Sequence, residues 1–238
     1  LVVNSGGANV FTGPDGLAAV ERTVEAAADL LVARPSKIFA ASTGVIGEPL
    51  AVEKITAALP DFKESLSALG WDGAAQAIMT TDTFPKGATR TADIGGVTVT
   101  INGIAKGSGM IAPDMATMLG FAFTDAKIPA PVLQRLVRWA SDESFNAITV
   151  DSDTSTSDTV LMFATGQAKG QPRIKGAGDK HLADFKAALR EVFVDLAQQV
   201  VRDGEGAQKF VTINVKGAES KRAARAVGLA VANSPLVK

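Results

Sequence analysis

Helix-like and strand-like segments alternate along the whole 238-residue chain, and this alternation limits the folds that are open to it. Apolar residues recur at three- and four-residue spacing in some segments and at every second position in others, which predicts amphipathic helices between half-buried strands. Because several strands alternate polar and apolar residues, we expect at least partly antiparallel sheets rather than a purely parallel one. The sequence therefore predicts a layered α/β (α+β) fold.

The predicted elements cover most of the chain. Helices are expected at 15–33, 49–69, 130–145, 179–203 and 219–233. Strands are expected at 1–10, 36–43, 74–82, 96–107, 118–126, 159–166 and 209–217. The glycine- and lysine-rich stretch 166–180 is typical of an exposed loop.

Composition excludes several classes of function. The 24 basic and 25 acidic side chains leave a formal net charge of −1, so there is no basic surplus for nucleic acid or for an acidic membrane surface. No apolar run is long enough to span a bilayer, and no signal-peptide pattern opens the chain. The chain has no cysteine, which excludes disulfides, thiolate zinc sites and a cysteine nucleophile. We therefore expect a cytoplasmic protein.

The histidine and tyrosine counts narrow the chemistry further. The chain has one histidine, His181, and no tyrosine. His181 lies at the polar start of a predicted helix, where an exposed side chain is the ordinary expectation. A histidine-rich metal site is thus excluded, and we expect neither a metal ion nor a cofactor. A nucleophile in this chain would take a carboxylate, a lysine or an α-amine as its base.

The stretch GMIAPDMATMLGFAFTDA (109–126) passes abruptly from a loop-like approach to an apolar strand, with Ala116 and Thr117 at the boundary. Attack of the Thr117 hydroxyl on the preceding carbonyl would cut the Ala116–Thr117 bond. The new terminus would then carry a nucleophile together with an amine whose pKa is about 7.7–8. This arrangement needs no histidine and no cysteine. The structural alternative is a plain turn that leads into a strand.

Two neighbouring motifs offer weaker candidates. KGSGM (106–110) is glycine-rich but lacks the spacing and the following helix of a phosphate-binding loop. In ITVDSDTST (148–156), a calcium loop is excluded because Thr156 and Met162 replace the required glycine and glutamate. Asp151 and Asp153 remain compatible with an aspartate-based, magnesium-dependent phosphatase. An acidic, hydroxyl-rich turn that satisfies its own backbone is the commoner structure for such a stretch.

Seven segments match, in order, motifs of the ornithine acetyltransferase family, whose members are also called glutamate N-acetyltransferases. They are NSGGANVFTG (4–13), STGVIG (42–47), MTTDT (79–83), KGSGMIAPDMATML (106–119), SFNAITVDSDTSTSDT (144–159), RDGEGA (202–207) and ANSPLVK (232–238). The resemblance runs over essentially the whole chain and includes the Ala-Thr pair at which this family cleaves itself. The chain is therefore identified as similar to this family throughout.

The resemblance implies a self-processing enzyme with a sandwich similar to that of N-terminal-nucleophile hydrolases, but with its own connectivity. The α portion would be 1–116 and the β portion 117–238. Family members extend further at both ends, so we expect a fragment that lacks a C-terminal segment with further substrate-site residues. The resemblance also implies α and β chains that assemble as a dimer of αβ pairs.

The resemblance assigns roles to six residues. Thr117 is implied to be the nucleophile, and Thr43 and Gly44 the oxyanion hole, with one hydroxyl donor and one unhindered amide. The acetyl group of N2-acetyl-L-ornithine would pass to Thr117 and then to L-glutamate, which gives ping-pong kinetics. Thr83, Lys106 and Glu205, together with Thr117, are implied to bind substrate, and we expect Lys106 to hold the α-carboxylate. We expect Glu205 to hold the ornithine ammonium.

The sequence departs from the family pattern at two positions and leaves two questions open. Phe11 replaces a smaller residue, which indicates a packing change, and Asp114 replaces an asparagine, which adds a negative charge near the cleaved bond. Acetyl-CoA serves some family members as a second acetyl donor. A hydrolase on the same scaffold, with water as the acceptor, is the alternative within the fold.

Overall fold

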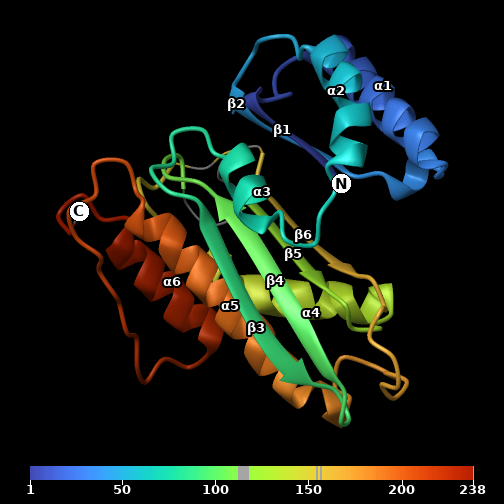
Figure 1. Cartoon of the computed structure of the whole chain (residues 1–238). Helices are drawn as coiled ribbons and strands as arrows, with labels where there is room; N and C mark the ends of the chain where they lie inside the picture. The colour runs from blue at the N-terminus through green and yellow to red at the C-terminus, as the bar shows by residue number, and fades with distance from the viewer. Residues whose placement is uncertain (112–117, 154, 156, 238) are drawn as a thin grey trace. The chain divides into compact units, whose positions relative to one another are not determined.

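The computed structural model describes residues 1–111, 118–153, 155 and 157–237, and it divides into two compact units, Leu1–Thr80 and Thr81–Lys238 (Figure 1). We call them the N-terminal unit and the C-terminal unit. This division follows packing, whereas the predicted division into 1–116 and 117–238 follows a covalent cut. Ala116, Thr117 and Asp114 lie outside the described residues, so the cut stays a prediction.

The N-terminal unit is a two-stranded parallel sheet with three helices. Its elements are β1 (Val2–Gly7), α1 (Gly13–Leu31), a 3-10 turn (Pro35–Lys37), β2 (Ala40–Val45), α2 (Val52–Glu64) and α3 (Trp71–Ala77). β1 and β2 pair with Val2 opposite Ala40. Helix α1 buries Ala19, Thr23 and Ala27, which follow one another at four-residue spacing and so lie on one face of the helix.

The C-terminal unit is built on a four-stranded sheet. Its elements are β3 (Lys86–Asp93), β4 (Thr98–Lys106), β5 (Leu119–Thr124), α4 (Ala130–Asp142), a 3-10 turn (Phe145–Ala147), β6 (Thr159–Ala164), a second 3-10 turn (Lys180–Leu182), α5 (Ala183–Arg202) and α6 (Lys221–Ala232). The strand order is β3-β4-β5-β6. Strand β4 runs antiparallel to both β3 and β5, and β6 runs parallel to β5.

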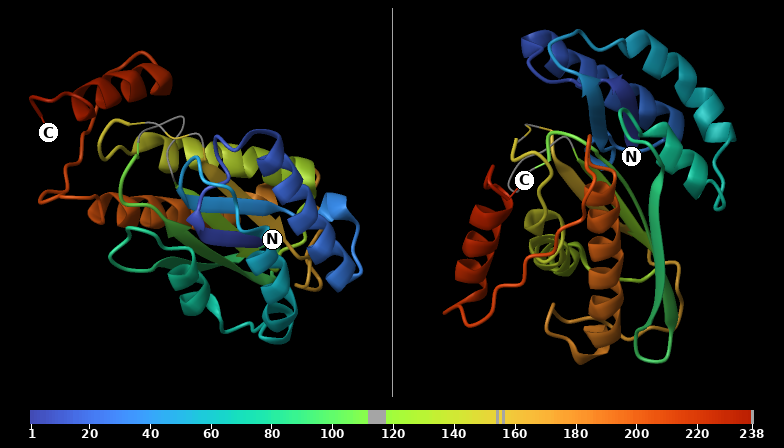
Figure 2. Two further views of the ribbon diagram at one scale, coloured as in Figure 1. Left: turned by 90° about the horizontal axis from the view of Figure 1, so that it is seen from above. Right: turned by 90° about the vertical axis from the view of Figure 1, so that its left-hand side faces the viewer.

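Helices α4 and α5 form one layer on the same face of this sheet (Figure 2). Alternate β4 residues, Val99, Ile101 and Ala105, point into the core under these helices. Helix α5 contributes an apolar stripe at helical spacing: Phe185, Ala188, Leu189, Val192, Phe193, Leu196, Ala197 and Val200. The predicted mixed α/β layering, with sheets that are at least partly antiparallel, is confirmed.

Three strand predictions were wrong or incomplete. Residues 71–77 form helix α3, because the alanine-rich sequence favours a helix over the strand predicted at 74–82. Residues 209–216 have no regular structure although their valines and threonines favour strands, since strand preference needs a partner strand to act on. Strand β3 was not predicted: KGATRTAD has few apolar residues, and pairing with β4 defines it. Among the described residues, no helix is long and apolar enough to cross a membrane.

Candidate active site

Lys106, predicted to bind substrate, is the last residue of β4 and is only 2% exposed. Its partner in the strand register is Leu119, the first residue of β5. Leu119 follows Thr117 by two positions in the sequence. The structure therefore places Lys106 opposite the start of the strand that follows the predicted cleavage point.

The ammonium of Lys106 lies among charged groups. Its Nζ is 3.7 Å from Oδ2 of Asp82. Burial lowers the pKa of Lys106, and the positive charge of Lys86 lowers it further, while the negative charges of Asp82 and Glu205 act in the opposite direction. Together these effects lower the Lys106 pKa, and the two carboxylates limit the fall.

Thr83, predicted to contact substrate, is held by a carboxylate at the end of α5. Its backbone amide donates to Oδ2 of Asp203 at 2.9 Å, and its hydroxyl donates to Oδ1 of the same carboxylate. Asp203 follows α5 directly and is 5% exposed. Thr83 itself remains accessible from solvent.

Glu205, the third predicted substrate residue, lies two positions after Asp203. Its amide donates to the carbonyl of Ser108 at 2.8 Å, which ties it to the segment that follows β4. Its side chain packs on Gly109, where an added Cβ would lie 2.8 Å from the carboxylate carbon. A side chain at 109 would therefore displace the Glu205 carboxylate from this position. The structure brings Thr83, Lys106 and Glu205 together in the C-terminal unit.

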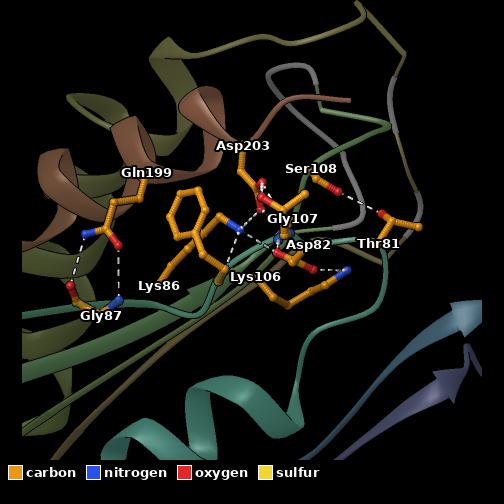
Figure 3. Close-up of polar contacts among 11 residues, drawn as sticks. Thr81, Asp82, Lys86, Gly87, Lys106, Gly107, Ser108, Gln199 and Asp203 are labelled. Carbon is orange, nitrogen blue, oxygen red and sulfur yellow. Dashed lines mark hydrogen bonds and ion pairs between the residues drawn. The ribbon is translucent and has the colours of Figure 1, made fainter. Parts of the chain in front are cut away.

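Sequence reasoning missed the three residues that hold this group: Asp82, Lys86 and Asp203 (Figure 3). Lys86 Nζ lies 2.7 Å from Oδ1 of Asp82 and 2.5 Å from Oδ2 of Asp203. Asp82 and Asp203 stand within the quoted motifs MTTDT and RDGEGA, next to predicted site residues, and that position was the available signal. Lys86 offered no signal, because a lysine between a proline and a glycine ordinarily indicates a solvent-exposed turn.

The predicted oxyanion residues lie on β2 in the N-terminal unit. Thr43 is fully buried, and Gly44 has a φ of +132°. A Cβ at position 44 would lie 2.3 Å from the carbonyl carbon of Gly6 on the paired strand. The glycine is therefore required by backbone packing alone. Its predicted role as an unhindered amide donor stays a prediction.

The aspartates of the 148–159 region bind the backbone on both sides of residues 112–117. Asp151 accepts from the amides of Met110 and Ile111, the latter at 3.0 Å, and Asp158 accepts from the amide of Met118 at 2.8 Å. The amide of Asp153 also donates to Asp151. Asp151 thus accepts from one amide of its own turn and from two amides of the segment that follows β4, so the self-satisfied acidic turn describes only part of its bonding.

Comparison with known proteins identifies the family to which the chain belongs. The ArgJ family matches residues 1–238, and the chain belongs to this family. It is 56% identical to the arginine biosynthesis bifunctional protein ArgJ of Agrobacterium fabrum and 58% identical to that of Brucella suis, in both cases over 100% of this chain and 58% of the relative. The protein of the same name from Gluconobacter oxydans is 55% identical over 56% of its length. The chain thus spans less than two thirds of these relatives.

Two solved structures resemble the chain. The ArgJ crystal structure from Bacillus halodurans is 37% identical over 49% of this chain and 59% of its own, with a TM-score of 0.43. An aminopeptidase from Ochrobactrum anthropi, described as a new variant among the Ntn-hydrolase fold, is 15% identical over 78% of this chain and 63% of its own, with a TM-score of 0.46.

Proposed function

We propose that the full-length protein is a self-cleaving acetyltransferase that moves the acetyl group of N2-acetyl-L-ornithine to L-glutamate in arginine biosynthesis. Membership of the ArgJ family supports this class. The observation that carries the proposal is the gathering of Thr83, Lys106 and Glu205 at the end of β4, opposite the start of β5. These three residues come from distant parts of the sequence, and each was predicted to bind substrate.

The first step is self-cleavage. The Thr117 hydroxyl attacks the carbonyl of Ala116, the peptide nitrogen leaves as the free amine of Thr117, and water hydrolyses the resulting ester. The new α-amine has an ordinary pKa of about 7.7–8, so a minor but appreciable fraction of it is neutral near physiological pH. One residue then supplies both the nucleophile and its base.

The second step is acetyl transfer. The Thr117 oxygen attacks the acetyl carbonyl, its proton passes to the α-amine, and the amide nitrogen of the donor takes a proton and leaves as ornithine. The amine of glutamate then attacks the acetyl ester, which restores the hydroxyl. In our proposal the Thr43 hydroxyl and the Gly44 amide stabilise the oxyanion of each tetrahedral intermediate.

The charges of the site suit two amino-acid substrates. The Lys106 ammonium is complementary to the α-carboxylate that ornithine and glutamate share. The carboxylate of Glu205 is complementary to the side-chain ammonium of ornithine. The donor and the acceptor can therefore use Lys106 in turn, while Glu205 is complementary to ornithine alone.

Membership of the ArgJ family favours the acetyltransferase over the phosphatase alternative on Asp151 and Asp153. A hydrolase on the same scaffold differs only in its acceptor. Use of acetyl-CoA, assembly as a dimer of αβ pairs and a cytoplasmic location remain parts of the proposal.

The test uses full-length wild type, Thr117→Ala and Thr117→Ser with N2-acetylornithine and glutamate, and with acetyl-CoA in a separate assay. We expect wild type to be cut before Thr117 and to form acetylglutamate. Thr117→Ala should lose both the cut and the transfer, while Thr117→Ser keeps part of each because the hydroxyl remains. Release of acetate without acetylglutamate would support the hydrolase, and a Thr117→Ala protein that still transfers acetyl groups would refute the mechanism.

A further inference from the structure

Four charged side chains are buried together where β3 begins and β4 and α5 end (Figure 3). We call them the buried charge cluster: Asp82, Lys86, Lys106 and Asp203, whose exposures are 8%, 0%, 2% and 5%. Two ammonium groups and two carboxylates give the cluster a net charge of zero. Charges are costly to remove from water, and a buried ion pair seldom stabilises a fold more than apolar residues would. A role other than stability therefore has to be considered.

Lys86 is the centre of the cluster. Its ammonium contacts both carboxylates, and it also lies 4.7 Å from the centroid of the Phe84 ring. The neighbouring Gly87 exchanges two backbone hydrogen bonds with the side-chain amide of Gln199 on α5, at 3.2 and 3.0 Å. These contacts fix the start of β3 against the end of α5, so that Asp82 and Asp203 are held at defined positions.

Asp203 determines the direction of the Thr83 hydrogen bond. Burial raises the pKa of Asp203, but hydrogen bonds from Lys86 and Thr83 outweigh this and lower it below its ordinary value. An ionised carboxylate has no proton to donate, so the Thr83 hydroxyl is the donor in their contact. A hydroxyl has only one proton. Thr83 can therefore accept a hydrogen bond from a further group but cannot donate one.

Asp82 acts at the end of β4. Its Oδ1 accepts from the amide of Gly107 at 2.6 Å, and its Oδ2 faces the Lys106 ammonium. An ammonium has three protons and no acceptor. Lys106 thus presents hydrogen-bond donors beside Asp82, the residue that precedes Thr83 in the sequence.

We propose that the buried charge cluster fixes the hydrogen-bond polarity of the substrate site, so that Lys106 donates to the substrate carboxylate and Thr83 accepts from the amide N–H of the N-acetyl donor. Lys86 and Asp203 are positioning residues in this proposal, because they act through Thr83. An amide donor would then be preferred to an ester donor that lacks the N–H. This inference rests on the proposed acetyl transfer.

The test compares two acetyl donors on the full-length protein: N2-acetylornithine and its ester analogue, in which oxygen replaces the amide nitrogen and no N–H remains. Thr83→Val should lower kcat/KM for the amide donor by roughly twofold to tenfold, the effect of one hydrogen bond, and leave the ester donor nearly unchanged. Asp203→Asn should also lower the preference for the amide donor, and it should add little in the Thr83→Val background. The matched control is Glu191→Gln, a carboxylate on α5 whose ion pair with Arg90 lies at the surface.

Equal losses for both donors in Thr83→Val, or full additivity of the two changes, would overturn the inference. If Asp203→Asn does not fold, the charge-balanced pair Lys86→Met with Asp203→Asn replaces it. The Thr83→Val comparison decides the acceptor assignment by itself, because both donors are compared in one variant and any effect of the hydrogen bond lost from Asp203 applies to both. A wild type that transfers acetyl from neither donor would instead refute the proposed function.

Discussion

In the N-terminal unit, Gly44 is fixed by the close approach of two backbones, whereas in the C-terminal unit Thr83 and Lys106 are fixed by buried charges. The first arrangement is steric, so it depends on the absence of a side chain and is insensitive to pH. The second is electrostatic, so it depends on charge balance and on protonation. We therefore expect the arrangement at Gly44 to be lost when a side chain is added, and the arrangement at Thr83 and Lys106 to be lost when a charge is removed. The following changes test that difference.

The largest effect is expected for Lys86→Met in the C-terminal unit. Removing the ammonium leaves Asp82 and Asp203 buried close together with one counter-ion fewer, at a cost of about 3–5 kcal/mol in the free energy of unfolding. Denaturant unfolding measures this cost. Adding Asp203→Asn restores charge balance and should recover a large part of the loss. If the double variant is no more stable than Lys86→Met alone, charge balance is not what holds this half of the site.

Gly44→Ala should have the next largest effect, confined to the N-terminal unit. The new Cβ would meet the Gly6 backbone at 2.3 Å, and the φ of +132° is unfavourable for alanine. Strain and overpacking together should cost about 2–4 kcal/mol, at every pH where the protein folds. The matched control is Gly73→Ala in helix α3, where a Cβ meets nothing within 4 Å and should stabilise by about 0.5–1 kcal/mol. Equal effects of the two changes would contradict the steric account of Gly44.

The smallest effect on catalysis concerns pH and is specific to the C-terminal unit. Because the variant used, Asp82→Asn, also weakens the ion pair with Lys86, the profile is measured on the folded protein beside an unfolding curve. The groups that act on Lys106 are Asp82, Glu205 and Lys86. Asp82→Asn removes a negative charge that raises the Lys106 pKa, so the pKa should fall further and the ammonium should be lost at a lower pH. The KM for acetylornithine should then rise severalfold at alkaline pH, while the acid side of the profile, set by the Thr117 amine, stays unchanged. An unshifted alkaline side would show that Asp82 does not support the Lys106 charge.

The comparison also shows what the sequence could predict. Lys106 and Glu205 were predicted because they stand in matched motifs, and the structure places them in one group. The buried role of Lys86 could not be predicted, because its two carboxylate partners lie 4 and 117 positions away and only the fold brings the more distant one to it. Periodicity located α4 and α5 well, since each buries a regular apolar stripe. Periodicity did not predict β3, and it predicted a strand at 209–217 that the structure does not have. In both places pairing with another strand decides whether a strand forms.

The central claim is that the acetyl group is carried on the Thr117 oxygen. The most direct test is the mass of the full-length protein's β chain after brief mixing with N2-acetylornithine in the absence of glutamate. We predict a chain that begins Thr-Met-Leu-Gly, gains the mass of one acetyl group on its first residue, and loses that mass when glutamate is added. A chain that begins elsewhere, or one that transfers acetyl groups without ever carrying one, would contradict the claim.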